Sequence, residues 1–249
     1  MRNIRLIARL DIKNFNLIKS INLEGLRIVG DPNKFAKKYY QEGIDELILM
    51  DCVATLYGRN NLSKIITEAT KDIFVPITVG GGLRNLDDAK NILNCGADKV
   101  AINTAAVLNP EFISELANSI GSQSVVISIE AKKISKNKWE VYTSNGREPT
   151  GINVLDWIKK IVNLGAGEIL LTSIDKEGTK TGFDVELMKN ATEITDVPII
   201  ASGGLGTTQH LIEVVNTGKI DAVAVADAVH YKRISVSELK NTISKIHHE

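Results

Sequence analysis

Residues 76–104 read PITVGGGLRNLDDAKNILNCGADKVAINT, and this stretch indicates how the whole chain folds. Two short apolar runs, at 77–79 and 100–102, have the length and composition of buried strands. Between them, apolar residues recur at helical spacing over 86–95. The stretch therefore predicts a strand, a glycine loop, a helix and a second strand, which is the unit that repeats in parallel α/β folds.

Each of these two strands ends in groups that suit an anion. Gly80, Gly81 and Gly82 end the first strand, and Asn103 and Thr104 follow the second. Glycines let backbone N–H groups approach a phosphate closely, and the N-terminus of the next helix adds positive potential. An isolated glycine run is often a simple turn, but at the end of a strand in a repeating strand–helix chain it favours a ligand site.

The alternation of apolar runs and helical patterns occurs eight times along the chain. The apolar runs lie near 4–10, 47–51, 76–79, 99–102, 124–130, 168–172, 198–201 and 222–225. The helical patterns lie near 32–43, 61–73, 86–95, 110–119, 153–164, 184–195, 208–217 and 235–246. Eight repeats predict one α/β domain over residues 1–249, a (β/α)8 TIM barrel with its active site at the C-terminal ends of the strands. The longest non-helical connections, at about 12–30 and 132–151, are candidate lids.

The composition argues against several classes of protein. The chain has 249 residues, of which 30 are basic, 30 are acidic and 43% are hydrophobic, which suffices for one large core. It carries no basic block and no aromatic stacking motif, so nucleic acid is not an expected partner. No apolar run reaches the length of a membrane span, and charges interrupt the N-terminus, so we expect a cytoplasmic protein with no membrane partner.

The cysteines and histidines do not indicate a cofactor. Cys52 and Cys95 are far apart and sit among apolar residues, which is typical of reduced thiols in a core. The four histidines do not occur at metal-ligand spacing, and neither cysteine has a neighbouring ligand. We therefore expect no metal and no other cofactor.

The chain also repeats itself at half its length. Gly81-Gly82-Leu83 recurs 122 residues later as Gly203-Gly204-Leu205. Such doubling divides the barrel into half-barrels at about 1–122 and 123–249, and it places two similar anion sites on opposite sides of the mouth. A long substrate with a charged group at each end would suit this arrangement.

The repeat also relates two carboxylates. Asp11 lies at the end of the first strand and Glu130 at the end of the fifth, 119 residues later. A carboxylate at a strand end is more often a solvated cap or an ion-pair partner. A symmetric pair beside glycine loops nevertheless favours a general acid and a general base.

Charged residues stand at or near the start of four strands. They are Arg5, Glu46, Lys99 and Glu168, from the first, second, fourth and sixth strands. A charge at that end of a barrel strand usually belongs to a surface ion pair. Four charges of alternating sign would instead be able to close a ring over the bottom of the barrel.

Several stretches together resemble the HisF family, the cyclase subunit of imidazole glycerol phosphate synthase, over essentially the whole chain. They are Leu10-Asp11-Ile12-Lys13, Gly30-Asp31-Pro32, Asp45-Glu46-Leu47, Thr78-Val79-Gly80-Gly81-Gly82, Gly96-Ala97-Asp98-Lys99-Val100, Ile102-Asn103-Thr104-Ala105-Ala106, Gly121-Ser122-Gln123, Gly165-Ala166-Gly167-Glu168-Ile169-Leu170-Leu171-Thr172-Ser173 and Ile200-Ala201-Ser202-Gly203-Gly204. The isomerase of the same pathway shares the doubling, but the run at 165–173 and the four charged strand starts resemble HisF.

This resemblance implies a two-protein glutamine amidotransferase. A HisH-like glutaminase would dock on the N-terminal face of the barrel and release ammonia, which passes the charged ring and reaches the C-terminal mouth. There it would react with a phosphoribulosyl-formimino intermediate, which cyclises and splits to imidazole glycerol phosphate and an aminoimidazole carboxamide ribotide, in histidine biosynthesis.

The resemblance also implies roles for individual residues. Asp11 and Glu130 match the catalytic carboxylates; Arg5, Glu46, Lys99 and Glu168 match the ammonia gate, and Asp98 matches the partner interface. Substrate and phosphate binding is implied for Lys19, Gly81, Gly82, Asn103, Thr104, Thr172, Ser202, Gly203, Gly204 and Asp227.

Three departures from the family pattern lie where the chemistry is expected. Glu130 replaces an aspartate, and one extra methylene moves its carboxylate by roughly an ångström, which can cost about a hundredfold in rate. Asp227 replaces a serine at the second phosphate site, where its charge opposes a dianion. The third departure is in two loops, Lys13-Asn14-Phe15-Asn16 and Tyr57-Gly58-Arg59-Asn60-Asn61.

Three hypotheses are compatible with this pattern. The first is an ordinary cyclase in which Glu130 substitutes for the aspartate. The second is a paralogue with the same barrel and glutaminase that serves another acceptor; HisF-like paralogues of surface-polysaccharide biosynthesis, which supply ammonia for an acetamidino sugar, are similar. The third is a non-catalytic scaffold that activates its glutaminase.

Overall fold

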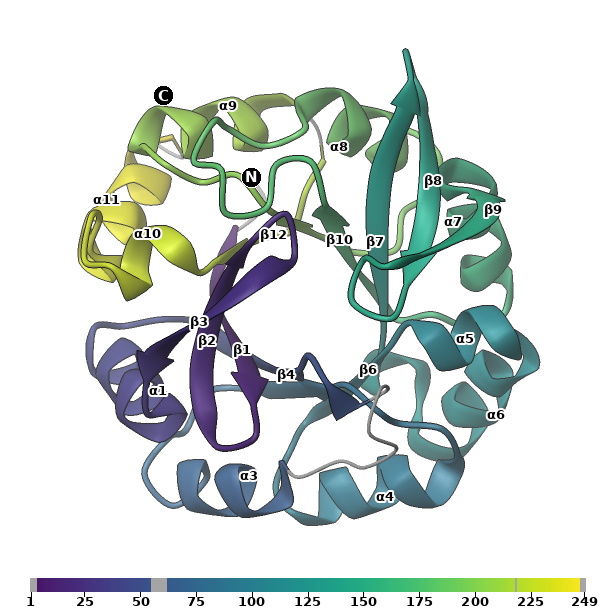
Figure 1. Cartoon of the computed structure of the whole chain (residues 1–249), viewed down its shortest axis with the longest axis horizontal. Coiled ribbons are helices and arrows are strands. Elements are labelled where there is room, and N and C mark those ends of the chain that lie inside the picture. Colours follow the sequence, from purple (N-terminus) through teal and green to yellow (C-terminus); the bar gives the residue numbers. More distant parts are fainter. Residues whose placement is uncertain (1–3, 55–61, 218, 247–249) are drawn as a thin grey trace.

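Eight parallel strands close into a barrel in the computed structural model, which describes residues 4–54, 62–217 and 219–246. In order around the barrel they are β1 (Arg5–Lys13), β4 (Glu46–Asp51), β5 (Ile77–Gly80), β6 (Lys99–Ile102), β7 (Val125–Ser135), β10 (Glu168–Ser173), β11 (Ile199–Ser202) and β12 (Ala222–Val225). The pairings of β12 with β1 and of β7 with β10 close the sheet (Figure 1). The predicted TIM barrel is confirmed.

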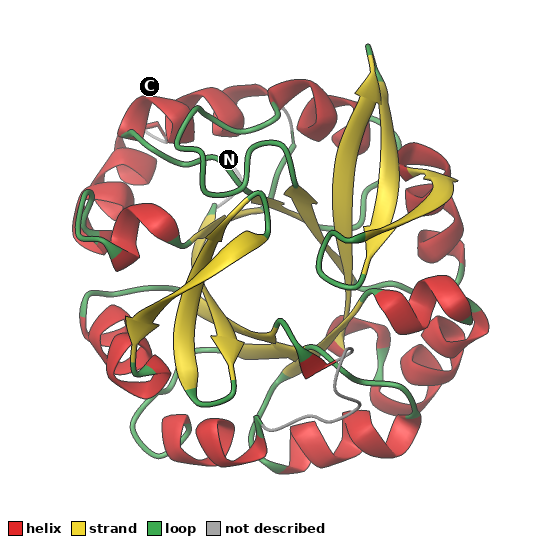
Figure 2. Ribbon diagram, viewed as in Figure 1, coloured by secondary structure: helices red, strands yellow, loops and turns green. Residues whose placement is uncertain are grey.

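Helices form an outer ring around the strands (Figure 2). They are α1 (Pro32–Gln41), α3 (Ser63–Ala69), α4 (Leu86–Asn94), α6 (Glu111–Ile120), α7 (Val154–Asn163), α8 (Val185–Thr192), α9 (Thr208–Thr217) and α11 (Val236–Ile246), with the short α5 (Thr104–Leu108) and α10 (Asp227–His230) and a 3-10 turn at Ser122–Ser124. Side chains cap several of them: Lys34 N–H donates to Asp31, and Glu238 N–H donates to Ser235. The predicted helices are all present, whereas α5 and α10 were not predicted.

The two long connections fold into antiparallel ribbons rather than irregular loops. β2 (Asn16–Ile21) and β3 (Glu24–Gly30) extend β1, while β8 (Lys138–Thr143) and β9 (Glu148–Asn153) extend β7. The sequence predicted non-helical segments here but not these strands. The turns of the two ribbons meet, because Asn145 Nδ2 donates to the Leu23 carbonyl at 3.4 Å.

Two apolar layers position the functional groups. One fills the space between the strands and the helices. The other lies inside the barrel and consists of Ile7, Ile48, Ala101, Val126, Leu170, Ile200, Ala222 and Ala224. Because side chains alternate along a strand, the residues two positions before and after this inner layer also point into the barrel. The inner layer therefore separates the charged residues at the bottom of the barrel from the polar groups at its mouth.

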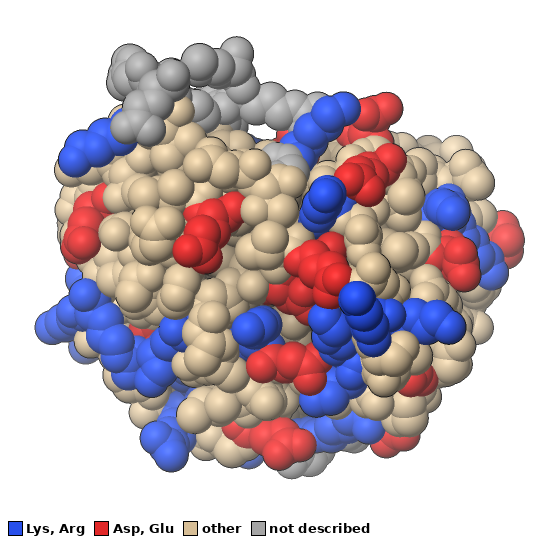
Figure 3. Space-filling model, turned by 90° about the horizontal axis from the view of Figure 1, so that it is seen from above, with Lys and Arg blue, Asp and Glu red and all other residues tan. Residues whose placement is uncertain are grey.

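The outer surface carries charges of both signs. On the face shown in Figure 3, basic and acidic side chains are interspersed, in keeping with the equal numbers of the two kinds in the sequence. None of the described helices is long and apolar enough to cross a membrane. The departure at Tyr57-Gly58-Arg59-Asn60-Asn61 lies outside the described residues.

Candidate active site

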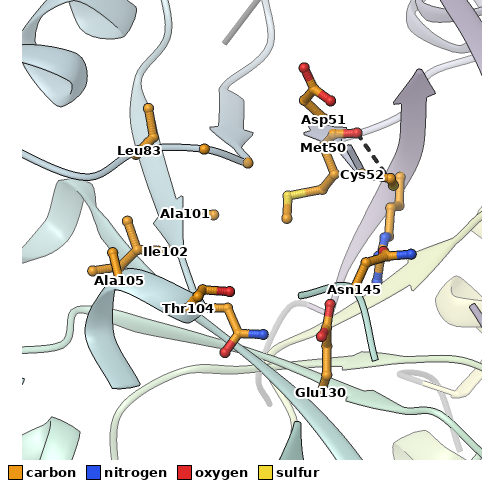
Figure 4. A pocket seen from close by; sticks show the side chains of 14 residues that line it. Met50, Asp51, Cys52, Leu83, Ala101, Ile102, Thr104, Ala105, Glu130 and Asn145 are labelled. Carbon is orange, nitrogen blue, oxygen red and sulfur yellow. Dashed lines mark hydrogen bonds between the residues drawn. The ribbon is translucent and has the colours of Figure 1, made fainter. Parts of the chain in front are cut away.

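Two cavities lie at the C-terminal ends of the barrel strands, and the side chain of Arg9 lines both. The walls of the first cavity include Asp51, Gly81, Gly82, Asn103, Thr104 and Glu130 (Figure 4). The walls of the second include Glu177, Ser202, Gly203, Gly204 and Asp227. The fold thus brings most of the predicted binding residues together as two groups, one at each cavity, whereas Lys19 and Thr172 line neither cavity.

The first cavity is built from bare backbone and anchored polar side chains. Gly81 has φ +100°, and a Cβ there would collide with the Asp51 carbonyl, so the position requires glycine. Asn103 Nδ2 donates to the Tyr142 carbonyl at 3.0 Å. The N–H of Ser144, in the β8–β9 turn, donates to Thr104 Oγ1 at 3.1 Å. The ribbon of β8 and β9 therefore holds this wall in a concave, polar form that suits an anion.

Glu130 lies on β7, in the wall of the same cavity. Its Oε2 accepts a 2.8 Å hydrogen bond from the N–H of Gly146, in the β8–β9 turn. Burial raises the pKa of Glu130 to about 7, although this bond and the charge of Arg9 act in the opposite direction. A carboxyl group with this pKa is able to take up and release a proton near neutral pH.

Asp11 lies on β1, which is the strand opposite β7 in the barrel. Its side chain is buried, and Arg9 Nε donates to its Oδ1 at 2.9 Å. Burial alone would raise the pKa of Asp11, but the charges of Arg9 and Lys19 and the bond from Arg9 lower it below its ordinary value. The two carboxyl groups therefore differ in protonation near neutral pH. Asp11 stays ionised, whereas Glu130 takes up and releases a proton.

The second cavity has the same glycine walls but a different charge. Gly204 has φ +111°, and a Cβ there would collide with the Gly182 carbonyl. Asp227 begins α10 and forms an ion pair with Arg233. This ion pair offsets the charge of the carboxylate, so its repulsion of a dianion is weaker than the sequence alone indicated.

Three further predicted binding residues contact other side chains in this structure. Thr172 Oγ1 and Ser202 Oγ accept hydrogen bonds from Arg9 Nη1 at 3.0 and 3.4 Å. Lys19, on β2, forms a buried ion pair with Glu177, in the segment that follows β10. This ion pair therefore connects the ribbon of β2 and β3 to the wall of the second cavity.

The four charged strand starts meet at the opposite end of the barrel. Arg5 donates to Glu46 and to Glu168, each at 2.6 Å. Lys99 Nζ lies 3.3 Å from Glu46 Oε2 and 2.8 Å from Glu168 Oε2. Each cation bridges both carboxylates, so the four side chains form a closed ring below the inner apolar layer.

Asp98 lies at the same end of the barrel and has a local structural role. Its Oδ2 accepts a 2.8 Å hydrogen bond from the N–H of Ile77, at the start of β5. Asp45 and Asp221 accept equivalent bonds from β1 and β11, at 2.7 and 3.1 Å. These carboxylates satisfy backbone donors where strands begin, which fixes the register at the bottom of the barrel.

Both cysteines are free and half-buried, but their surroundings differ. Cys95 packs against the hydrophobic core, as expected, whereas Cys52 lines the first cavity. Burial of its sulfur and the nearby Asp11 carboxylate raise the pKa of Cys52 well above its ordinary value, so the thiol is protonated and a poor nucleophile. Within the described parts of the chain, no three His, Cys, Asp or Glu side chains are grouped to hold a metal ion.

Comparison with known proteins gives the family. The family model described as "Histidine biosynthesis protein" matches residues 5–235. The chain is also 61% identical over 206 residues to the imidazole glycerol phosphate synthase subunit HisF of Legionella pneumophila, and the match covers 83% of this chain and 97% of that protein. The chain belongs to the HisF family. The resemblance identified from the sequence motifs is confirmed.

Two buried groups of this HisF-family barrel were missed by reasoning from its sequence, Arg9 and Glu177. A signal for Arg9 was present, because it stands two positions before Asp11 in a strand that is otherwise apolar there, and so shares its inward face. Glu177 had no such signal, because it lies in an irregular segment where periodicity is absent.

Proposed function

We propose that the chain is a HisF-type synthase subunit that works with a glutaminase. It would use ammonia to convert phosphoribulosyl-formimino-AICAR phosphate to imidazole glycerol phosphate and AICAR, in histidine biosynthesis. The observation that carries the proposal is the pair of glycine-walled cavities that flank Arg9, with Asp11 and Glu130 beside them. Two anion cradles in one mouth fit a substrate with a phosphate at each end. The 61% identity to the L. pneumophila synthase subunit supports the same assignment.

The two carboxyl groups suit the two requirements of ammonia chemistry. When ammonia attacks a carbon atom, positive charge develops on its nitrogen and a proton must then leave. An ionised Asp11 stabilises that charge. Glu130, with a pKa of about 7, accepts the proton and returns one in the later ring-closing and cleavage steps.

The ring at the bottom of the barrel suits a route for ammonia. Arg5, Glu46, Lys99 and Glu168 balance each other's charges, and the inner apolar layer lies directly above them. A neutral molecule enters an apolar passage far more readily than ammonium does, because burial of an unpaired charge is costly. We place the glutaminase on this face, with Asp98 close to its interface.

A second candidate is a paralogue with the same ammonia supply and another acceptor, such as an acetamido sugar that becomes an acetamidino sugar. Two contacts favour it. Asp227 lines the cavity where a second phosphate would bind, and its carboxylate still opposes a dianion there although Arg233 offsets part of its charge. The longer side chain of Glu130 is held by Gly146 N–H, which draws its carboxylate toward the second ribbon.

Steady-state turnover with the phosphoribulosyl-formimino substrate and free ammonium tests the assignment, at alkaline pH where ammonia is unprotonated and no partner is needed. We expect product from the purified barrel. Asp11→Asn should lower turnover by about a hundredfold or more, and Glu130→Asp should raise it. Asp72→Asn, on the exposed outer surface, is the matched control and should leave turnover unchanged.

Two outcomes would contradict the proposal in different ways. A folded barrel that gives no product but still stimulates a glutaminase favours the paralogue. A barrel in which neither Asp11→Asn nor Glu130→Asp changes any ammonia-dependent activity is a scaffold.

A further inference from the structure

Arg9 places a positive charge in the middle of the barrel. Along β1, the inward side chains are Arg5 in the bottom ring, Ile7 in the inner apolar layer, Arg9 and then Asp11. Arg9 is 3% exposed, and it is the side chain that the two cavities share. A buried guanidinium in such a place requires partners that compensate for its lost hydration.

The partners of Arg9 come from three strands. Its Nε donates to Asp11 Oδ1 at 2.9 Å on β1, while Nη1 donates to Thr172 on β10 at 3.0 Å and to Ser202 on β11 at 3.4 Å. The planar guanidinium has its donors in fixed directions. The two hydroxyl groups therefore determine the plane of the guanidinium, and that plane determines where the Asp11 carboxylate is held.

Asp11 has one oxygen bound and one oxygen without a protein partner. Its Oδ2 is buried and has no hydrogen bond among the described residues. Buried polar atoms are nearly always satisfied, so this unpartnered carboxylate oxygen requires a donor. Asp11 itself lines neither cavity, but its partner Arg9 lines both, so a donor that enters past Arg9 is the one we infer. The bond from Arg9 takes Oδ1 and leaves Oδ2 for that donor.

We propose that Arg9 is the positioning residue of the site, which holds the Asp11 carboxylate ionised and in a fixed orientation with Oδ2 as its free acceptor. The inference rests on the proposed function in one respect, that Asp11 takes part in the reaction. It assigns Thr172 and Ser202 to the support of Arg9.

Other charged and titratable groups also act on this pair. Lys19 on β2 and His230 on α10, together with Arg9, lower the pKa of Asp11. Glu177 and Cys52 raise the pKa of Arg9, and Asp11 raises the pKa of Glu130. Among these groups, Arg9 alone donates a hydrogen bond to Asp11 within the described residues. Its removal should therefore alter both the charge and the orientation of Asp11.

The test compares Arg9→Gln, Arg9→Lys and a charge-matched control, Lys37→Met, at an exposed pair on the outer surface. The first readout is the pKa of Asp11, from carbon-13 NMR of the carboxyl group, assigned with Asp11→Asn. In the parent protein we expect Asp11 to titrate below its ordinary value of about 3.9. Arg9→Gln should raise this pKa by about one to three units, Arg9→Lys by less, and the control should not change it.

The second readout is the pH profile of ammonium-dependent turnover. In Arg9→Gln, kcat should fall in acid and recover in alkali as Asp11 ionises. A merely structural role for Arg9 would lower kcat equally at every pH. An Asp11 pKa that Arg9→Gln does not move would overturn the proposal.

Two provisions keep the test decisive. Should Arg9→Gln not fold, Thr172→Val removes one anchor of the guanidinium while keeping the side-chain shape. It should raise the Asp11 pKa by less than one unit, and no change in it would contradict the proposal. Should the parent show no turnover, the proposed function fails, but the NMR titration still decides whether Arg9 governs Asp11.

Discussion

Two charged clusters lie at opposite ends of the barrel interior, and the same strand supplies an arginine to each. The bottom ring contains Arg5, Glu46, Lys99 and Glu168. The mouth cluster contains Arg9, Asp11, Lys19 and Glu177. Each cluster has two cations and two anions, and the inner apolar layer separates them. Their cations differ in hydration: the side chains of Arg5 and Lys99 are 25% and 18% exposed, whereas those of Arg9 and Lys19 are each 3% exposed, and the carboxylates are buried in both clusters.

This difference in exposure determines how much each ion pair contributes to the stability of the fold. Charges that remain in contact with water are screened, and an exposed pair contributes little. Charges removed from water interact more strongly, but each depends on its partner, because an unpaired buried charge is costly. The ring is therefore suited to opening and closing, while the mouth cluster is suited to holding groups in fixed positions.

The largest effect should come from Arg9→Met, which removes a cation from the mouth cluster. It leaves the Asp11 carboxylate buried without its hydrogen-bonded partner. We expect a loss of about 3–5 kcal/mol in the free energy of unfolding at neutral pH, measured by urea denaturation. A loss below about 1 kcal/mol, the range of exposed pairs, would mean that water reaches Asp11 and that the two clusters are alike.

A smaller, pH-dependent effect should come from Glu130→Gln, which tests how dry the mouth is. The pKa of Glu130 is about 7 when folded and about 4.3 when unfolded. Between these values the folded state binds the extra proton, so stability falls as pH rises through this window, by on the order of 4 kcal/mol. Glutamine cannot ionise, so the variant should lack this slope in melting temperature between about pH 4 and pH 8.

Glu186→Gln is the matched control for that experiment, because Glu186 is in a half-exposed surface pair with Lys133. It should keep the parental slope. If Glu130→Gln kept it as well, Glu130 would be hydrated and its pKa ordinary.

The smallest effect should come from Arg5→Met, the same substitution four residues earlier on β1. Glu46 and Glu168 each keep Lys99 as a partner, and water reaches the side chains of Arg5 and Lys99. We expect a loss of about 1–2 kcal/mol in the free energy of unfolding, again by urea denaturation, and a loss that shrinks as salt is added. A loss equal to that of Arg9→Met would show that exposure does not distinguish the two clusters.

The barrel was predictable because its signals are local and repeated. Each of the eight strands, from β1 to β12, is a short apolar run, and a helix of period 3.6 follows most of them. The ribbons were less visible. In β8, Trp139, Val141 and Thr143 alternate with more exposed residues, a strand signal that lies inside what the sequence presents as a loop. In the first ribbon, Leu23 has φ +64°, which its residue type does not indicate.

The functional groups were predictable in part. Gly81, Gly204, Asp11 and Glu130 stand at strand ends, where a parallel barrel places its active site. Their hydrogen-bond partners and protonation states were not predictable from the sequence. The sequence treated Asp11 and Glu130 as an equivalent pair, whereas the structure binds Asp11 to Arg9 and Glu130 to the N–H of Gly146.

The sequence by itself determined the barrel, its doubled glycine loops and the family, because these follow from patterns that need no contacts: short strand–helix units, a repeat at 122 residues and motifs along the whole chain. The tertiary structure alone decided which charges meet at the mouth, whereas the sequence had already indicated that the four charged strand starts could form a ring. Arg9 contacts Thr172 and Ser202 from 163 and 193 residues away, and Lys19 contacts Glu177 from 158 residues away. Burial and pKa depend on distances to every neighbouring charge and on access to water, and those distances exist only once the barrel has closed.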